Sequence, residues 1–251
     1  MTIPRPSARG AALDILLTVE AGGFTDEGLA DLASSTLERE DQALAREIVY
    51  GTLRRRRMID AVLEAYLRQP IDALTSLTLI LLRLSVYQLR HLDRVPAYAI
   101  VSEAVDLAKQ RDPQRASLVN AVLRGIADRR KLEPAPSPDD IGLTQSFPDW
   151  LIKRWVDRFG AEATLRTCEA INARQPVSIH VGPGVARRDL AESLAAEGFQ
   201  TRVCGDDLLY VDHATGLFDT QTFHRGWFFA QGPGAACVVD LLNLTPGLSF
   251  L

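Results

Sequence analysis

Two amphipathic helical segments joined by a polar turn, within residues 95–126, constrain the fold of this chain more than any other feature. Arg111, Asp112 and Pro113 form the turn, and Asn120 is a polar residue among apolar neighbours in the second segment. Apolar residues recur at helical spacing along both segments, namely Ile100, Ala104, Val105, Ala108, Leu118, Val122 and Ile126. Such stripes are buried against other helices, so the pair predicts a larger helical unit.

The sequence before this pair also favours helices. Ser7 is a suitable N-cap for a helix that ends at Gly22-Gly23, and Pro70 stops a later one. Further helices are expected over residues 26–34, 38–50, 54–67 and 74–89. The last of these is the most apolar and should be central. Together with the opening pair, this makes about seven helices in roughly the first 130 residues.

A different organisation is expected after residues 131–138, KLEPAPSP, because three prolines in eight residues favour an extended linker. Helices and strands then alternate, which predicts a mixed α/β domain. Helices are expected over 149–159, 161–171, 187–197 and 234–242, and strands over 175–181, 201–204, 208–211 and 227–230. Along the first strand Val177, Ile179 and Val181 alternate with His180, which therefore faces the opposite side, toward a ligand surface.

Composition and spacing exclude several classes of protein. No apolar run reaches the ~18 residues of a membrane span, and no apolar signal segment follows the N-terminus. Cys168, Cys204 and Cys237 are odd in number and widely spaced, which suits a reduced cytoplasm and matches no zinc spacing. The Gly182-Pro183-Gly184 segment is interpreted as a strand-to-helix turn rather than a phosphate cradle. We expect a cytoplasmic protein with no metal and no membrane partner.

The opening segments carry the first family resemblance. Their register, V-P-x-x-x-I-x-E-A-V-x-L-A-K followed by L-V-N-x-V-L, resembles the C-terminal helices of the NusB family. That family is an all-helical RNA-binding fold, so the resemblance implies an RNA-binding bundle. Charge is compatible with this, because residues 1–133 carry 19 Lys+Arg against 18 Asp+Glu, and residues 134–251 carry 9 against 14. Arginines outnumber lysines, which we attribute to a GC-rich genome rather than to phosphate recognition.

The run from Arg54 to Arg57 is the densest cluster of charge. It is expected at the start of a helix, where the helix dipole disfavours cations. Contact with phosphate would explain it, whereas pairing with Glu38, Glu47 or Asp60 is the alternative.

Other basic residues are expected to extend this surface. Arg5 and Arg9 should lie in a mobile N-terminal arm, and further cations flank the turn near residue 112 and the end of the last helix. The residues expected to bind RNA are Arg5, Arg9, Arg54, Arg55, Arg57, Lys109, Arg111, Arg115, Arg129 and Arg130.

The α/β part carries a second resemblance. Phe147 to Glu162 resembles the F-P-x-W-L-x-x-R-W-x-x-x-(Y/F)-G-x-E segment of the RNA cytosine-C5 methyltransferases. In the Fmu/Sun branch, ribosomal RNA small-subunit methyltransferase B, a NusB-like domain precedes this segment, as it does here. Gly226 to Gln231 resembles the later G-W-x-x-x-Q segment, although Ile179 to Gly182 stands where the family has R-V-N, and Gly232 to Ala236 replaces its acidic and serine residues.

The resemblance implies an S-adenosylmethionine-dependent 16S rRNA (cytosine-C5)-methyltransferase with a Rossmann-like catalytic domain downstream. The family's glycine-rich cofactor loop, D-x-C-A-A-P-G-G-K-T, and its Pro-Cys pair do not occur in this sequence. Thr167-Cys168 lies far upstream of the family's Thr-Cys nucleophile, so we interpret it as coincidental. Cytosine-C5 methylation needs a cysteine thiolate, so this chain alone, a truncated form of the enzyme, is expected to bind no cofactor and to be inactive.

The expected fold is therefore a multidomain one. Residues 1–132 form a NusB-like all-α RNA-binding domain, 133–145 a Pro-rich linker, 146–231 a small α/β (RRM/ferredoxin-like) RNA-recognition domain, and 232–251 the start of the methyltransferase domain. The expected partner is small-subunit ribosomal RNA, bound by a monomer. A stand-alone NusB-like transcription antitermination factor is the alternative, but that family ends after the helical bundle. A protein-interaction module would bind no RNA at any salt concentration.

Overall fold

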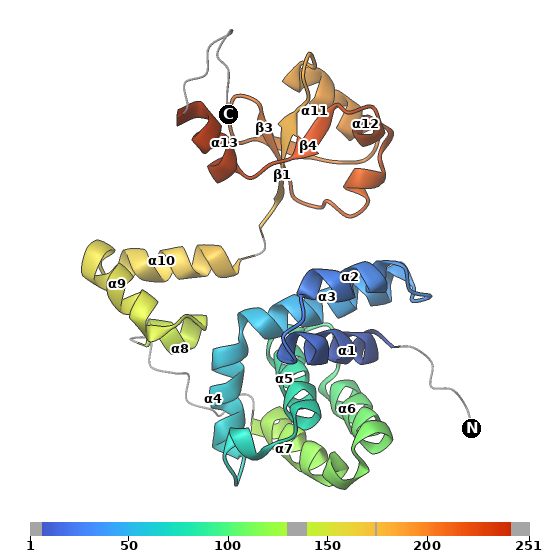
Figure 1. Ribbon diagram of the computed structural model, residues 1–251, viewed down its shortest axis with the longest axis vertical. Helices are drawn as coiled ribbons and strands as arrows, with labels where there is room; N and C mark the ends of the chain where they lie inside the picture. Colours follow the sequence, from blue (N-terminus) through green and yellow to red (C-terminus); the bar gives the residue numbers. More distant parts are fainter. Residues whose placement is uncertain (1–6, 130–139, 174, 242–251) are drawn as a thin grey trace. The chain divides into compact units, whose positions relative to one another are not determined.

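The computed structural model describes residues 7–129, 140–173 and 175–241 (Figure 1). The chain divides into two compact units, unit 1 at Met1–Asn172 and unit 2 at Ala173–Leu251. Unit 1 is helical, and unit 2 contains a small antiparallel sheet with helices. The predicted fold class, a helical bundle followed by a small α/β domain, is confirmed. None of the described helices is long and apolar enough to cross a membrane.

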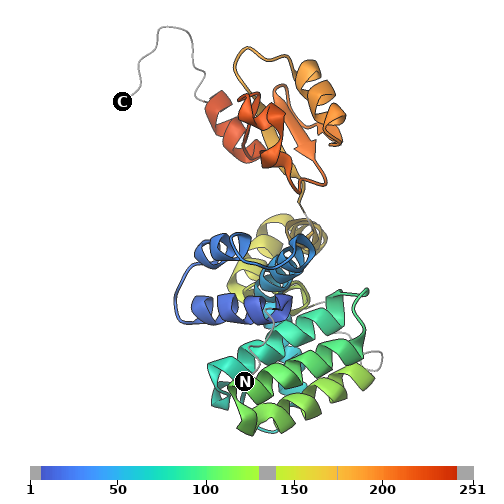
Figure 2. The same ribbon diagram turned by 90° about the vertical axis from the view of Figure 1, so that its right-hand side faces the viewer.

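The described part of unit 1 consists of α-helices and two short 3-10 turns. Ser7 caps the first helix as predicted, because its Oγ accepts a hydrogen bond from the amide of Gly10 at 3.1 Å. The helices are α1 (Ala8–Glu20), α2 (Thr25–Ala33), α3 (Arg39–Arg54), α4 (Arg56–Tyr66), α5 (Ser76–His91), α6 (Ala97–Arg111), α7 (Ala116–Arg129), α8 (Ile141–Gln145), α9 (Asp149–Phe159) and α10 (Ala161–Asn172). Figures 1 and 2 show α1 to α7 packed as a bundle, and α8 joins α9 and α10 to it through contacts with α4.

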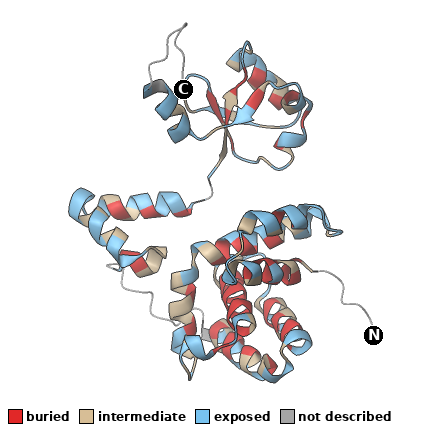
Figure 3. Cartoon of the chain, viewed as in Figure 1, coloured by how far each residue is buried: buried red, intermediate tan, exposed pale blue. Residues whose placement is uncertain are grey.

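Helix α5 is the centre of the bundle. Every residue from Thr78 to Leu89 is buried, so this helix has no solvent-facing side (Figure 3). A helix that is buried on all sides must be surrounded by other helices, and α1, α3, α4, α6 and α7 all pack against α5. The prediction that the most apolar segment is central is confirmed.

The pair α6 and α7 forms as the sequence predicts. Helix α6 ends at Arg111, and a short 3-10 turn over Pro113–Arg115 leads into α7. Asp112 fastens this turn to the start of α5, because its Oδ2 accepts hydrogen bonds from the hydroxyls of Thr75 at 3.3 Å and Thr78 at 3.2 Å. The end of α6 therefore lies beside the start of α5, and the two helices run antiparallel.

Helices α8 to α10 belong to unit 1. Helix α8 lies within the predicted linker at 133–145, whose last five residues are therefore helical rather than extended, and α9 and α10 follow it. Ser146 ends α8 in the left-handed region at φ 62°, and its Oγ accepts a hydrogen bond from the Met58 amide in the first turn of α4 at 3.0 Å. Asn172 at the end of α10 donates to the carbonyl of Gln145 at 2.8 Å. The compact units thus meet at residues 172 and 173, later than the predicted linker at 133–145, part of which lies outside the described residues.

Unit 2 is built on a four-stranded antiparallel sheet with the strand order β2-β3-β1-β4. Its strands are β1 (Val177–Val181), β2 (Thr201–Val203), β3 (Leu208–Val211) and β4 (Phe228–Ala230), and its helices are α11 (Arg187–Ala196), α12 (Gln221–His224) and α13 (Pro233–Leu241). Gly182 to Gly184 is a turn between β1 and α11, as predicted. A Cβ on Gly182 would stand 2.4 Å from the carbonyl oxygen of Gly226, so only glycine lets the two segments approach here.

Candidate nucleic-acid interface

The sequence predicted that the run of four arginines, Arg54 to Arg57, starts a helix. In the structure the run spans the corner between helices α3 and α4. Arg54 is the last residue of α3, Arg55 lies between the helices, and Arg56 begins α4. A cation in the last turn of a helix is favoured by the helix dipole, so Arg54 causes no electrostatic conflict with its own helix. The prediction of a helix starting at Arg54 is wrong, since α3 ends at Arg54 and α4 begins at Arg56. No proline or glycine stands at residues 54–56 to mark the end of α3 in the sequence.

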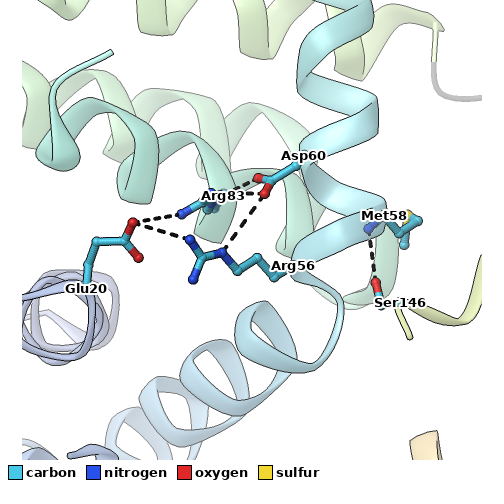
Figure 4. Close-up of polar contacts among 6 residues, drawn as sticks. All are labelled: Glu20, Arg56, Met58, Asp60, Arg83 and Ser146. Carbon is cyan, nitrogen blue, oxygen red and sulfur yellow. Dashed lines mark hydrogen bonds and ion pairs between the residues drawn. The ribbon is translucent and has the colours of Figure 1, made fainter. Parts of the chain in front are cut away.

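Arg56 belongs to an internal ion-pair network rather than to a free surface (Figure 4). Its guanidinium lies 3.3 Å from Glu20 and 4.0 Å from Asp60. Arg83 of α5 reaches the same two carboxylates, with Nε and Nη2 donating to Asp60 at 2.7 and 2.9 Å. Figure 4 shows both guanidinium groups pointing between Glu20 and Asp60. The predicted alternative of internal pairing with Asp60 is thus confirmed for Arg56.

Arg57, a predicted RNA contact, also has internal partners. Its guanidinium donates to the carbonyl of Phe147 and pairs with Asp149 at 2.7 Å. These bonds hold the start of α9 against the start of α4. Arg57 therefore connects two parts of unit 1, and its side chain is not free to bind a ligand.

Arg54 and Arg55 differ from the two arginines that follow them. Arg54 is exposed and Arg55 half-buried, and the side chain of neither makes a hydrogen bond or an ion pair with another residue in the described part of the chain. Tyr50 lies one helical turn before Arg54 and is 45% exposed. Tyr87 and His91, near the end of α5, stack with ring centroids 5.2 Å apart. We call Tyr50, Arg54, Arg55, Tyr87 and His91 the arginine corner.

A glycine and a carboxylate fix the tyrosine of this corner. The Tyr87 hydroxyl donates a hydrogen bond of 2.6 Å to Glu47 of α3. Burial first, and then this bond, raise the pKa of Tyr87 above its usual range. The ring lies directly over Gly51, where an added Cβ would meet Tyr87 Cζ at 1.9 Å. Glycine at position 51 therefore allows α3 and α5 to approach closely at the corner.

The pKa values of two groups report a positive potential at the corner. Desolvation and then the charge of Arg54 lower the pKa of Arg55. Desolvation, followed by the charges of Arg55 and Arg90, lowers the pKa of His91 to about 4, although Asp93 and Glu47 act in the opposite direction. Burial is the largest cause of both shifts, and at His91 the charges of Arg55 and Arg90 outweigh those of Asp93 and Glu47. An anion such as phosphate would therefore be stabilised beside these arginines.

The lowered pKa of His91 predicts a dependence of stability on pH. Unfolded histidine titrates near 6.5, so between pH 6.5 and about 4 the unfolded chain binds more protons at this position than the folded chain. The contribution of His91 to stability should therefore be fully present above pH 6.5 and be lost as the pH falls toward 4. Urea unfolding of the wild type and His91→Gln at pH 7.5 and 4.5 measures this. An unchanged difference between the two proteins at the two pH values would contradict it.

Several other predicted RNA contacts are engaged internally. Arg9 is in α1 and only 9% exposed, with Nε donating to Gln88 at 2.6 Å and Nη1 pairing with Glu103. The prediction that Arg9 lies in a mobile arm is therefore wrong. Arg111 makes a two-point ion pair with Asp14, which raises the pKa of Arg111.

The remaining residues that were predicted to bind RNA do not share one environment in the structure. Lys109 is exposed and pairs with Asp106 at 3.2 Å. Arg115 is half-buried, and its side chain makes no hydrogen bond or ion pair with any other described residue. Arg5 and Arg130 lie outside the described residues, and the side chain of Arg129 is likewise not described.

The predicted cations do not form one surface. Arg55 lies next to Tyr87 and His91 near the C-terminal end of α5, whereas Asp112, adjacent to Arg111, bonds Thr78 at the N-terminal end. Thr78 and His91 are 13 positions apart in the sequence, which corresponds to about 20 Å along the helix. The basic residues therefore fall into two groups at opposite ends of α5.

Sequence reasoning missed the aromatic members of the corner. The spacing of Tyr50 and Arg54, four residues apart, was a signal that they share one face of a helix. Nothing local links Tyr87 or His91 to the arginines, because the contact depends on the packing of α3 against α5. Asn120, the polar residue noted in the second helical segment, has a partner within its own helix, because its Oδ1 accepts a hydrogen bond of 3.0 Å from Arg124.

The described residues contain no cluster of three or more His, Cys, Asp or Glu side chains that could hold a metal. The three cysteines form no disulfide. Burial raises the pKa values of Cys168 and Cys204, which disfavours the thiolate form of each.

Two models of known protein families match separate segments of the chain. The model of the NusB family matches residues 6–128, and that of the RsmF/B-like methyltransferase ferredoxin-like domain matches residues 147–215. The second match begins at α9, so by sequence the ferredoxin-like domain includes two helices that pack with unit 1.

Individual relatives match over much of the chain. A "Probable ribosomal RNA small subunit methyltransferase B" of Bacillus subtilis is 32% identical over 78% of this chain and 45% of that protein. The protein of the same name from Synechocystis is 30% identical over 96% of this chain and 56% of its own length. The "Ribosomal RNA small subunit methyltransferase B" of Thermus thermophilus is 39% identical over 61% of this chain and 36% of that protein. The chain thus spans about half the length of these relatives or less.

A solved structure shares the fold. The crystal structure of PH0851 superposes with a TM-score of 0.72, covering 98% of this chain and 57% of that one, at 18% sequence identity. At this identity the likeness concerns the fold alone.

Proposed function

From the premise that this chain, with its NusB domain and its RsmF/B-like ferredoxin-like domain, belongs to the ribosomal RNA small subunit methyltransferase B family, we propose that it is the RNA-binding N-terminal part of a 16S rRNA (cytosine-C5)-methyltransferase. Unit 1 would bind small-subunit ribosomal RNA at the arginine corner. The protein would act as a cytoplasmic monomer.

The observation that carries this proposal is the pair of adjacent arginines without carboxylate partners. Arg54 and Arg55 stand next to each other at the α3–α4 corner, and the pKa of Arg55 is lowered by desolvation and by Arg54. Two guanidinium groups that repel each other are stabilised when a phosphate binds between or beside them. The exposed ring of Tyr50 adds a surface on which an unpaired base can stack.

The methyl transfer itself we assign to the part of these relatives beyond the matched region. S-adenosylmethionine would be the methyl donor of the full-length enzyme, and a cysteine thiolate would add to the cytosine ring to make C5 nucleophilic. We propose that residues 1–251 alone neither bind this cofactor nor catalyse. Their role would be to position the RNA substrate, since positioning lowers the barrier of the reaction.

Within the chain we propose that residues 1–132 are the NusB-like RNA-binding domain and residues 146–231 the RNA-recognition domain, joined by residues 133–145. The final residues, 232–251, would lead into the catalytic domain. The alternative of a stand-alone transcription antitermination factor is disfavoured by the ferredoxin-like match at residues 147–215.

Replacing both corner arginines tests the proposed RNA site. Arg54→Ala/Arg55→Ala should weaken the binding of a small-subunit rRNA hairpin by roughly tenfold or more, because each arginine removed loses a charge-assisted contact to phosphate. Fluorescence anisotropy with the labelled hairpin gives the Kd at fixed salt.

A second double variant controls for the loss of two positive charges. Arg166 and Arg188 are exposed and pair with Glu162 and Glu192 four residues away, so Arg166→Ala/Arg188→Ala removes the same charge elsewhere. We expect its affinity to change less than twofold to threefold. Equal losses in the two double variants would show a general charge effect and overturn the assignment of the site to the corner.

A further inference from the structure

The sheet of unit 2 has two chemically different faces. The residues of its core face pack with α11 and α12 around one apolar cluster, and they are Ile179, Val181, Leu209, Val211 and Phe228. The opposite face presents side chains from all four strands, and we call four of them the stacking face: Arg202, Tyr210, His180 and Phe229. Helix α13, which follows β4, has no buried side chain among its described residues.

Two face-to-face contacts organise the stacking face. The rings of His180 and Phe229, which are paired across β1 and β4, lie nearly parallel, with centroids 5.0 Å apart and an interplanar angle of 15°. The guanidinium of Arg202 lies 4.5 Å from the ring centroid of Tyr210, its partner across β2 and β3. Each of the four strands therefore contributes one planar group to this face, in the order of the strands across the sheet.

These flat groups remain accessible. Phe229 is 44% exposed, the Arg202 side chain is 55% exposed, and His180 and Tyr210 are half-buried. The Nδ1 atom of His180 lies 2.8 Å from the carbonyl oxygen of Val181. Since a carbonyl only accepts, Nδ1 carries the proton and Nε2 of the neutral ring is an acceptor. A single exposed ring is common on protein surfaces, but here Phe229 is grouped with His180, Tyr210 and Arg202 on one face of the sheet. Such a group of flat side chains fits a ligand with flat, partly apolar faces.

We propose that the stacking face binds unpaired bases of single-stranded RNA, an inference that rests on the proposed RNA-binding function and assigns the RNA contact of residues 146–231 to this face. Bases stack on aromatic rings and on guanidinium planes, and this face offers both on adjacent strands. Phosphate does not dominate the recognition, because residues 173–251 carry five basic and eight acidic side chains. The RNA is thus held here by its bases, whereas the arginine corner holds it by phosphate.

The test removes the rings and keeps the apolar volume. Phe229→Leu/Tyr210→Leu in the 251-residue chain should weaken binding to a short single-stranded rRNA fragment by roughly tenfold or more, since stacking contributes about that factor for each base. Binding to the same fragment annealed to its complement should not change, because paired bases present no free face. The loss should be equal at low and high salt, as stacking releases no counterions.

Phe218→Leu is the matched control. Phe218 is 39% exposed, close to the exposure of Phe229, but it contacts Phe223 and Phe228 on the core side of the sheet. Its replacement should leave the affinity for single strands unchanged. Circular dichroism and thermal unfolding confirm that each variant is folded.

Different results would contradict the stacking face and the RNA site at the arginine corner. Unchanged single-strand affinity in Phe229→Leu/Tyr210→Leu, with RNA binding still lost in Arg54→Ala/Arg55→Ala, would overturn the stacking face and favour a protein partner for this surface. Loss of single-strand affinity in the ring variant alone, with the arginine variant unaffected, would support the stacking face and contradict the corner.

Discussion

Arg83→Ala is expected to lower the free energy of unfolding of unit 1 by about 3 to 5 kcal/mol, the range for removing one partner of a buried ion pair. The Arg83 side chain is 5% exposed and binds Asp60 through two parallel hydrogen bonds of 2.7 and 2.9 Å. It also lies 3.5 Å from Glu20. Removing the guanidinium leaves these two carboxylates with Arg56 alone as a cation among the described residues, and Arg56 contacts them at 3.3 and 4.0 Å from a side chain that is 49% exposed.

Thermal unfolding and urea titration measure this loss, which corresponds to a Tm lower by roughly 10 °C for a domain of this size. Arg56→Ala is the matched control, because Arg56 contacts the same Glu20 and Asp60 from a side chain that is 49% exposed. Pairs at that exposure contribute less than about 1 kcal/mol. Equal destabilisation by the two substitutions would show that burial does not decide the strength of this network.

Gly51→Ala is expected to destabilise the bundle by about 1 to 3 kcal/mol, although alanine is the better helix former. The added Cβ would lie 1.9 Å from Cζ and 2.2 Å from the hydroxyl oxygen of Tyr87. The ring would have to move, and its hydrogen bond to Glu47 would be broken. Because Tyr87 stacks on His91, the same substitution should also disturb the arginine corner.

Gly125→Ala separates this clash from the general effect of alanine. Gly125 is also helical and also faces a tyrosine ring, but its Cβ would lie 3.1 Å from Tyr66 Cδ1. A shift of a few tenths of an ångström relieves that contact, so the change should stay within about 1 kcal/mol of the wild type. If Gly51→Ala unfolds at the same urea concentration as the wild type, the close approach of α3 and α5 is not needed.

Features that depend on neighbouring residues were predictable from the sequence. Ser7 marks the start of α1 and Pro113 the turn after α6, because capping and proline geometry act over a few residues. The alternation of Ile179, His180 and Val181 placed His180 on the side opposite the core, and the sheet confirms this. Helix α8 was missed, since five residues are too few for helical periodicity to appear.

The partners of the charged residues were not predictable, because they come from distant segments. Arg9 meets Glu103 through the packing of α1 against α6, and Arg57 meets Asp149 through the attachment of α9. A run of arginines gives no sign of which members will be paired. The corner was therefore predicted in part, through Arg54 and Arg55, whereas Tyr87 and His91 are visible only once α5 is placed against α3.

The division of the arginine run into paired and unpaired members is central to the proposed function. Arg56 and Arg57 stabilise unit 1 through Glu20, Asp60 and Asp149. Arg54 and Arg55 have no such role among the described residues and lie in a positive field. One short stretch of sequence would thus supply both an internal ion-pair network and an external anion site.

The salt dependence of RNA binding tests this claim most directly. Each phosphate contact that releases a counterion contributes roughly 0.7 to 0.9 to the slope of log K against log salt concentration. If Arg54 and Arg55 both contact phosphate, the slope measured with the rRNA hairpin should become shallower by about 1.4 to 1.8 in Arg54→Ala/Arg55→Ala. An unchanged slope, with the variant binding as the wild type does at every salt concentration, would contradict RNA binding at the arginine corner.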